Sequence, residues 1–400
     1  MPNDLSATID KLKELCRTKP ACTTKGREGA DFNILGKFLG SFAKFEPKRD
    51  PTFLLLRCDD GVREKLEHAY PGAVALSTKM KWDTKGWHWT DVQLNSPVPM
   101  ETLQKLIDDS YELVLRNLSE NEQFQVELVG RHLSAAELLD ELLRHYGLSG
   151  RRAEILKLAR QSVLLKTLPA DSAATRTFIG GAPFLPADMP WPEHSGKPLA
   201  FLAQIDLAEI GKVAKLPDLP PTGLFCLFSV YGWQDPDGAD PLTPGGEPAD
   251  DWTQIYFVDA ASVPAQPRKT PSKVQPFPRA AVQPVPVLSL PCTAGEPALA
   301  AAGFSGDEAA SLVDMASTYN NLLSYQLGHP ARHLLLGFAD FVQYVTQSVA
   351  EQNLKLLFQI ASDKNTNMCW GDGGYLYFFI KPENLNPLDL YGVVTDYQCG

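Results

Sequence analysis

Residues 354–380 read LKLLFQIASDKNTNMCWGDGGYLYFFI, and this segment decides the expected fold. An apolar run over 354–360 leads into a polar loop, which ends in WGDGG at 370–374 before a second apolar run over 375–380. Two apolar and aromatic runs joined by a glycine-bearing connection are typical of an antiparallel hairpin. We therefore predict two paired strands with a long loop between them.

The same pattern occurs earlier in the chain. The sequence FLAQID at 201–206 begins a strand and GLFCLF closes the pair, with Gln204 in the place that Gln359 holds later. A third match relates FIGGAP at 178–183 to LLGFAD at 335–340. Because the three matches keep their order at an offset of roughly 150–156 residues, they indicate a duplicated unit that buries one shared core.

The length of 400 residues exceeds what one hydrophobic core usually serves. We predict an α+β chain in three parts: a small helix–sheet domain over 1–120, a helical linker over 121–170, and a mainly antiparallel-sheet domain over 171–400. The repeats should cover about 175–260 and 330–400. Apolar residues at helical spacing in the linker indicate packed helices.

Composition and charge narrow the class of protein. Hydrophobic residues make up 44% of the chain and charged residues 21%, which is typical of globular proteins. No apolar run reaches the about 20 residues that span a bilayer, and the charged N-terminal segment differs from a secretory signal, so we expect a cytoplasmic protein without membrane contact. The seven cysteines lack C-x-x-C spacing, which favours reduced thiols. The net charge of −11 disfavours nucleic acid and favours a basic protein partner.

The N-terminal part carries LLLRCDDGVREKLEHAYPGA at 54–73 and TKGWHWTDVQLNSPVPMETLQKLIDDSYELVLRNL at 84–118. In this order the two segments resemble the MmcQ/YjbR family, which implies a frataxin-like α+β fold and a connection with nucleic acid. Lysines interleaved with aromatic residues can contact phosphates and stack on bases. Alternatively, Trp87 and Trp89 fill one face of a strand while the lysines solvate a loop. The candidate nucleic-acid wing comprises Lys79, Lys81, Trp82, Lys85 and Trp87.

The C-terminal part carries TFIGGAPFLPADMPWPEHSGKPLAFLAQIDLAEI at 177–210, HLLLGFADFVQ at 333–343 and the segment 354–380. These sequences resemble the YwqG family of bacterial cytoplasmic proteins. The resemblance implies a duplicated fold dominated by antiparallel sheet, without an established reaction. Some members are encoded near secreted toxins and are suspected of immunity roles, so an immunity function is one expectation for this chain.

An acidic, proline-rich segment interrupts the C-terminal part between 234 and 300. A loop of this length inside a domain is typical of a functional or a disordered segment. Aspartates on a protruding loop would mimic phosphate and block the active site of a basic, nuclease-like toxin. The predicted partner-binding residues are Asp235, Asp237, Asp240, Asp250 and Asp251.

Candidate chemistry is sparse. His329 and His333 have the i,i+4 spacing of two metal ligands, but a third ligand is missing, and a loop that enters a strand at 334–336 explains them better. Sequence motifs for serine nucleophiles, P-loops and dinucleotide binding are absent, so we predict no catalytic residue, metal or cofactor. Asp372 either accepts backbone N–H groups within its turn or contributes to a binding cleft. The candidate cleft residues are Trp191, Asp206, Trp370, Asp372, Tyr375 and Tyr377.

The sequence favours a non-enzymatic protein-binding module, most concretely an immunity-type protein that occludes the active site of a basic toxin. Two alternatives remain. One is a nucleic-acid-associated regulator that works through the N-terminal wing. The other is an enzyme or small-ligand binder that uses the tryptophan–aspartate cleft.

Overall fold

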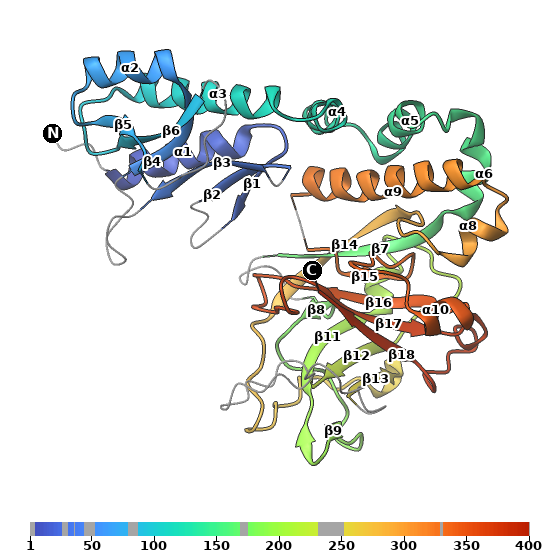
Figure 1. Cartoon of the computed structure of the whole chain (residues 1–400). Coiled ribbons are helices and arrows are strands. Elements are labelled where there is room, and N and C mark those ends of the chain that lie inside the picture. Colours follow the sequence, from blue (N-terminus) through green and yellow to red (C-terminus); the bar gives the residue numbers. More distant parts are fainter. Residues whose placement is uncertain are drawn as a thin grey trace. The chain divides into compact units, whose positions relative to one another are not determined.

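The computed structural model describes residues 5–25, 31–35, 37–43, 53–78, 87–168, 175–230, 252–328 and 331–399. The chain forms two compact units, Met1–Leu133 and Ser134–Gly400 (Figure 1). Across these described ranges, no helix combines the length and apolar content needed to cross a lipid bilayer.

Within its described residues, the first unit combines a six-stranded antiparallel sheet with four helices. Strand order is β1-β2-β3-β4-β6-β5, and helix α3 packs on β3 and β4 with α1 beside it. The Asp59 side chain begins α2 by accepting the N–H groups of Gly61 and Val62. The elements are α1 (Leu5–Thr18), β1 (Cys22–Lys25), β2 (Asp31–Ile34), β3 (Lys37–Ala43), β4 (Phe53–Asp59), α2 (Asp60–Ala69), β5 (Val74–Leu76), β6 (Trp87–Gln93), α3 (Met100–Arg116) and α4 (Glu120–Gly130).

The tryptophan of β6 whose side chain is described lies inside the first unit. Trp89 is 5% exposed and packs with Leu55, while the Arg57 guanidinium lies 5.1 Å from its ring centroid. A buried indole cannot stack on a nucleic-acid base, so Trp89 fills a sheet face as the alternative interpretation expects. The likeness of this mixed helix–sheet unit to the frataxin fold stays a prediction.

The second unit is built on one ten-stranded antiparallel sheet, in the order β13-β12-β11-β8-β14-β7-β15-β16-β17-β18. Its strands are β7 (Arg160–Thr167), β8 (Phe178–Ile179), β11 (Ala200–Asp206), β12 (Leu224–Ser229), β13 (Thr253–Val258), β14 (Ala280–Ser289), β15 (Leu334–Leu335), β16 (Lys355–Ala361), β17 (Tyr375–Ile380) and β18 (Val394–Gln398), with a short hairpin of β9 (Glu193–His194) and β10 (Lys197–Pro198). Its helices are α5 (Ala135–His145), α6 (Arg152–Leu158), α7 (Leu207–Ile210), α8 (Pro297–Ala301), α9 (Gly306–Gln326) and α10 (Gln347–Glu351).

The ten-stranded sheet curls until its two edge strands meet. The Thr253 hydroxyl of β13 lies 2.7 Å from the Thr395 hydroxyl of β18, so the sheet is nearly closed. Aromatic side chains fill its interior, where Phe225 and Phe358 pack edge to face at 5.1 Å. Helix α9 lies alongside β7 and β14 (Figure 1), and the Lys166 ammonium donates to the carbonyl of Leu327 beyond its end (2.6 Å).

The sheet consists of two halves with the same pairing pattern. The first half is β8, β11, β12 and β13, the second half is β15, β16, β17 and β18, and the long β7–β14 pair joins them. Gln204 of β11 pairs with Cys226, and Gln359 of β16 pairs with Tyr377 in the same register. Both β11 and β16 have an irregularity two residues before the glutamine.

The structure corrects one of the sequence matches. Phe178 pairs with Gln204, and Leu334 pairs with Gln359. Phe178 therefore corresponds to Leu334, whereas the match of FIGGAP with LLGFAD placed it opposite Leu335. The match set Gly180 against Gly337, whereas Gly181 is the residue that corresponds to Gly337 in the structure. Gly180 corresponds to Leu336, a non-glycine residue that also has a positive φ, of 58°.

Candidate functional site

A buried glutamine fixes two loop positions in the second half of the sheet. Gln359 accepts the backbone N–H of Asp340 (2.8 Å) and donates from its side-chain amide to the carbonyl of Arg332 (2.7 Å). Because Gln359 is fully buried, each of these hydrogen bonds also satisfies a polar group that water cannot reach. The glutamine thus holds the backbone of both residues beside β16.

Gln204 makes the same two bonds in the first half. It accepts the N–H of Phe184 (2.7 Å) and donates to the carbonyl of Arg176 (2.8 Å). The side chains at these positions differ between the halves. In the first half the exposed Arg176 lies 5.7 Å from the Phe184 ring, whereas the second half has a carboxylate, Asp340, in the place of that ring.

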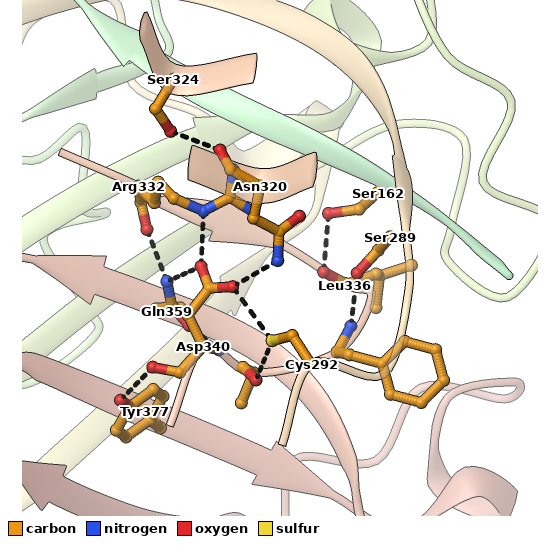
Figure 2. A network of polar contacts seen from close by, with 12 residues as sticks. Ser162, Ser289, Cys292, Asn320, Ser324, Arg332, Leu336, Asp340, Gln359 and Tyr377 are labelled. Carbon is orange, nitrogen blue, oxygen red and sulfur yellow. Dashed lines mark hydrogen bonds and ion pairs between the residues drawn. The ribbon is translucent and has the colours of Figure 1, made fainter. Parts of the chain in front are cut away.

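Four donors surround the Asp340 carboxylate, as Figure 2 shows. Each carboxylate oxygen receives two of them, so its hydrogen-bonding capacity is largely used within the protein. Oδ2 accepts from Arg332 Nε (2.6 Å) and Gln359 Nε2 (3.0 Å), and Oδ1 accepts from Asn320 Nδ2 (2.9 Å) and Cys292 Sγ (3.5 Å). This carboxylate is arranged to hold its neighbours in place.

Burial and pairing set the protonation of this cluster. The side chains of Arg332 and Asp340 are only 7% and 14% exposed. Burial alone would lower the pKa of Arg332, but the charge and hydrogen bond of Asp340 outweigh it and raise that pKa. Burial raises the pKa of the Cys292 thiol, and the nearby Asp340 raises it further. With this raised pKa, Cys292 stays protonated and can donate to Asp340. It does not have the thiolate form that a reactive cysteine needs.

The cluster continues into an irregular segment, residues 341–344, which we call the 341–344 loop. The Tyr377 hydroxyl donates to the carbonyl of Asp340 (2.8 Å) at its start. The Phe341 ring stacks on Phe379 at 5.7 Å and lies 5.4 Å from Tyr377. These contacts fix the first residue of the loop on the buried aromatic residues Tyr377 and Phe379 of β17.

The buried side chain of Gln398 fixes the rest of the loop. Its carbonyl oxygen accepts the N–H groups of Val342 and Gln343 (3.1 Å each), and its amide donates to the carbonyl of Tyr344 (2.8 Å). The side chains of Val342 and Tyr344 nevertheless remain 40% and 62% exposed. The loop therefore presents an aliphatic and an aromatic side chain from a backbone held in one conformation.

The six candidate cleft residues occupy separate places. Tyr377 is buried in the cluster above, with Tyr375 at 5.9 Å from it. Trp370 is 2% exposed and packs against Phe277, while Asp372 is exposed in the following turn. The Asp206 carboxylate accepts N–H groups at the start of α7, which is a capping role. Trp191 lies in a hollow of the first half together with Tyr256 and Arg268.

The predicted partner-binding residues Asp235, Asp237, Asp240, Asp250 and Asp251 lie outside the described residues, as do Lys79, Lys81, Trp82 and Lys85 of the candidate wing. Trp87 lies at the start of β6, but its side chain is also outside the described part.

The histidine pair considered for metal binding has only one described member. His333 is fully buried; its Nε2 lies 3.1 Å from Asp363 Oδ2, and its Nδ1 accepts the N–H of Ala361 (3.0 Å). Both ring nitrogens are thus occupied by protein groups, which makes His333 an interior structural residue. Among the residues that the structure describes, no group of three histidine, cysteine or acidic side chains fits a metal ion.

The ion pair between Arg332 and Asp340 was not predicted from the sequence. A difference between the two repeats could have pointed to this pair, because LLGFAD ends in an aspartate and FIGGAP ends in a proline. The one-residue error in that match concealed the relevant pair, which is Phe184 and Asp340.

Comparisons with known proteins identify a family for the second unit. The family model DUF1963, described as a domain of unknown function, matches residues 177–399 and is consistent with a YwqG-like domain. No curated protein sequence matches the chain. Among solved structures, the crystal structure of Deinococcus radiodurans protein DR2400, with the domain DUF419, has 24% sequence identity and covers 30% of this chain and 87% of that chain, at a TM-score of 0.25. A TM-score this low gives no basis for assigning a fold.

Proposed function

The chain belongs to the DUF1963 family, and we propose that its second unit is a protein-binding module without catalytic activity. The observation that carries the proposal is the 341–344 loop, whose backbone is fixed by buried polar groups while Val342 and Tyr344 stay exposed. Tyrosine is enriched among residues that dominate binding energy, and a preformed loop loses little conformational entropy on association.

The polar cluster supports this role better than a role in acid–base chemistry. A general base needs a lone pair within hydrogen-bond reach of its substrate. The Asp340 carboxylate instead receives donors on both oxygens, from Arg332 and Gln359 among others. Its backbone groups, in turn, bind Gln359 and Tyr377 at the start of the loop. The ion pair therefore supports the shape of a surface.

The charge of the chain favours a basic partner. The net charge of −11 would accelerate association with a positively charged protein. In its finer form, the proposal is an immunity-type cytoplasmic protein that occludes the active site of a nuclease-like toxin, with the aspartates of the 235–251 segment as further contacts. Replacing those aspartates with asparagine should then slow association at low salt.

The test compares variants of the exposed loop residues with a matched control. The combined variant Val342→Ser and Tyr344→Ser keeps the backbone hydrogen bonds, because Gln398 binds only main-chain groups of the loop. Tyr391→Ser removes a tyrosine that is 88% exposed elsewhere on the unit. Proteins that co-purify with each variant from the native host are quantified by mass spectrometry. We expect a stoichiometric partner that the unchanged protein and Tyr391→Ser recover and the loop variant does not. Equal recovery by these three proteins would refute the role of the loop.

A further inference from the structure

A second surface of this unit is a hollow of about 630 Å³ on the first half of the sheet, which we call the Trp191 groove. Its lining includes Trp191, Glu193 of β9, Leu199 between β10 and β11, Gln254 and Tyr256 of β13, and Arg268 beyond β13.

The two aromatic side chains of the groove are held in position from below. The Trp191 indole N–H donates to the carbonyl of Leu199 (3.0 Å), and its ring packs edge to face on Phe228 at 5.4 Å. The Tyr256 ring packs on the same Phe228 at 5.8 Å. Phe228 belongs to β12, whose residues are all buried, so both rings rest on the packed part of the sheet. The groove is thus preformed, and a ligand does not have to order it.

Arg268 closes one side of the groove but is already occupied. Its guanidinium donates to the carbonyls of Met189 (2.5 Å) and Pro186 (3.3 Å) and lies 6.0 Å from the Trp191 ring. The arginine therefore fixes the segment that carries Pro190 and Trp191. The carboxylate of Glu193, in contrast, is at an exposed position of the lining. A ligand thus meets the exposed carboxylate of Glu193 in a groove whose other charged lining residue is Arg268.

We infer that the Trp191 groove binds an extended, proline-containing segment of another protein that has a basic residue beside its prolines. Grooves lined by aromatic rings accept the pyrrolidine rings of a polyproline II helix, whose backbone carbonyls are free to accept hydrogen bonds. Trp191 supplies the ring surface. The Tyr256 hydroxyl and the second N–H of the Gln254 amide, whose first N–H donates to the carbonyl of Ile255 (3.0 Å), are donors of the kind such carbonyls need. A basic residue on the ligand is favoured by the exposed carboxylate of Glu193 and by the net charge of −11 on the chain, while the positive charge of Arg268 lies on the side of the groove next to the Trp191 ring.

This inference rests on the proposed protein-binding function for the class of its ligand, but it uses another surface. Loss of the 341–344 loop contacts should leave the groove intact, because Trp191 and Tyr256 of the groove pack on Phe228 in the first half of the sheet, whereas the loop belongs to the second half. The loop variant Val342→Ser and Tyr344→Ser should therefore bind a groove ligand as well as the unchanged protein does. The two ideas can fail separately.

The experiment measures fluorescence anisotropy of labelled synthetic peptides titrated with the full chain. The probe has alternating proline and alanine residues flanked by two arginines. One control peptide has alanine at every proline, and another has glutamates in place of the arginines. Saturable binding of the probe alone is expected. Binding that is absent, or equal for the probe and the alanine peptide, would overturn the inference.

Two variants then assign the binding to the groove. Glu193→Arg alters an exposed side chain, so folding is preserved. This variant should bind the probe about threefold more weakly and the glutamate-flanked peptide more tightly than the unchanged protein does. Trp191→Phe keeps a ring on Phe228 but removes part of the aromatic surface. Its affinity for the probe should fall about tenfold. Circular dichroism checks that both variants fold. An affinity unchanged in Glu193→Arg would place the peptide elsewhere and refute the assignment.

Discussion

The ion pair between Arg332 and Asp340 yields the most direct test of how the second unit is held together. Replacing Asp340 with Asn leaves the 7% exposed Arg332 side chain without its counter-charge. An uncompensated buried charge costs about 3–5 kcal/mol. For a unit of this size, a loss of 1 kcal/mol lowers Tm by roughly 2–4 °C, so the Asp340→Asn variant should melt about 6–20 °C earlier.

The double variant Arg332→Met and Asp340→Asn separates pairing from packing. It removes both charges, and the asparagine carbonyl can still accept a bond from Gln359 or Asn320. Its cost should be about 1–2 kcal/mol, below that of Asp340→Asn alone, because no lone charge stays buried. The single variants are then strongly non-additive, as expected of residues in direct contact. Arg176→Met is the matched control, since Arg176 holds the equivalent position but is exposed; its cost should stay under about 1 kcal/mol.

The assay is urea unfolding of the full chain followed by hydrogen-exchange mass spectrometry. Because the chain has two units, peptides from β16 and α9 report on the second unit separately from peptides of the first. Additive costs for Arg332→Met and Asp340→Asn would refute the reasoning, since they would show that the two side chains act independently. A double variant less stable than Asp340→Asn alone would refute it as well.

Two further predictions follow from buried groups of the same unit. Burial tends to raise the pKa of Asp363, but hydrogen bonds from His333, the Thr167 hydroxyl and the N–H of Asn365 lower it to about 2, below its usual value near 4. Asp363 therefore contributes about 2 kcal/mol of stability above pH 4 that is lost as the pH falls toward 2, and Asp363→Asn should flatten this part of the pH profile in urea unfolding at pH 2–6. Gly374→Ala would place a Cβ 1.9 Å from the carbonyl oxygen of Gln398 and should cost about 3 kcal/mol or more in thermal unfolding, whereas Gly306→Ala meets open space and should be nearly neutral. A Gly374→Ala protein as stable as the Gly306→Ala control would contradict the close packing of β17 and β18.

Local patterns in the sequence predicted the hairpin and the equivalence of Gln204 and Gln359. Alternating and continuous apolar runs determine which residues form strands, and the paired runs at 354–380 do form β16 and β17. The antiparallel character of the second unit follows from such hairpins. The two glutamines lie within these runs, so an alignment of the runs also aligns the glutamines.

Contacts between distant segments could not be predicted in this way. The sheet closes through Thr253 and Thr395, which are far apart in the chain and carry no local signal of pairing. Three of the four donors to Asp340 likewise come from distant regions of the chain, at Cys292, Asn320 and Gln359. The candidate cleft failed to assemble for a similar reason, because residue type alone does not tell on which side of a strand or turn a side chain lies.

The duplication suggests where the functional surfaces of the second unit arose. The two glutamines impose the same backbone geometry on both halves, so the surface must differ through the side chains placed on that geometry. With Phe184 at the shared position, the first half extends into an aromatic groove at Trp191. With Asp340 there, the second half needs a buried counter-charge, and that pair anchors an exposed loop. Arg176 and Arg332 hold equivalent positions in the two halves, so the stability of their methionine variants shows what an arginine at this position contributes in each half. A large cost at Arg332 alone would show that the charged support belongs to the second half only, although both halves share the glutamine framework.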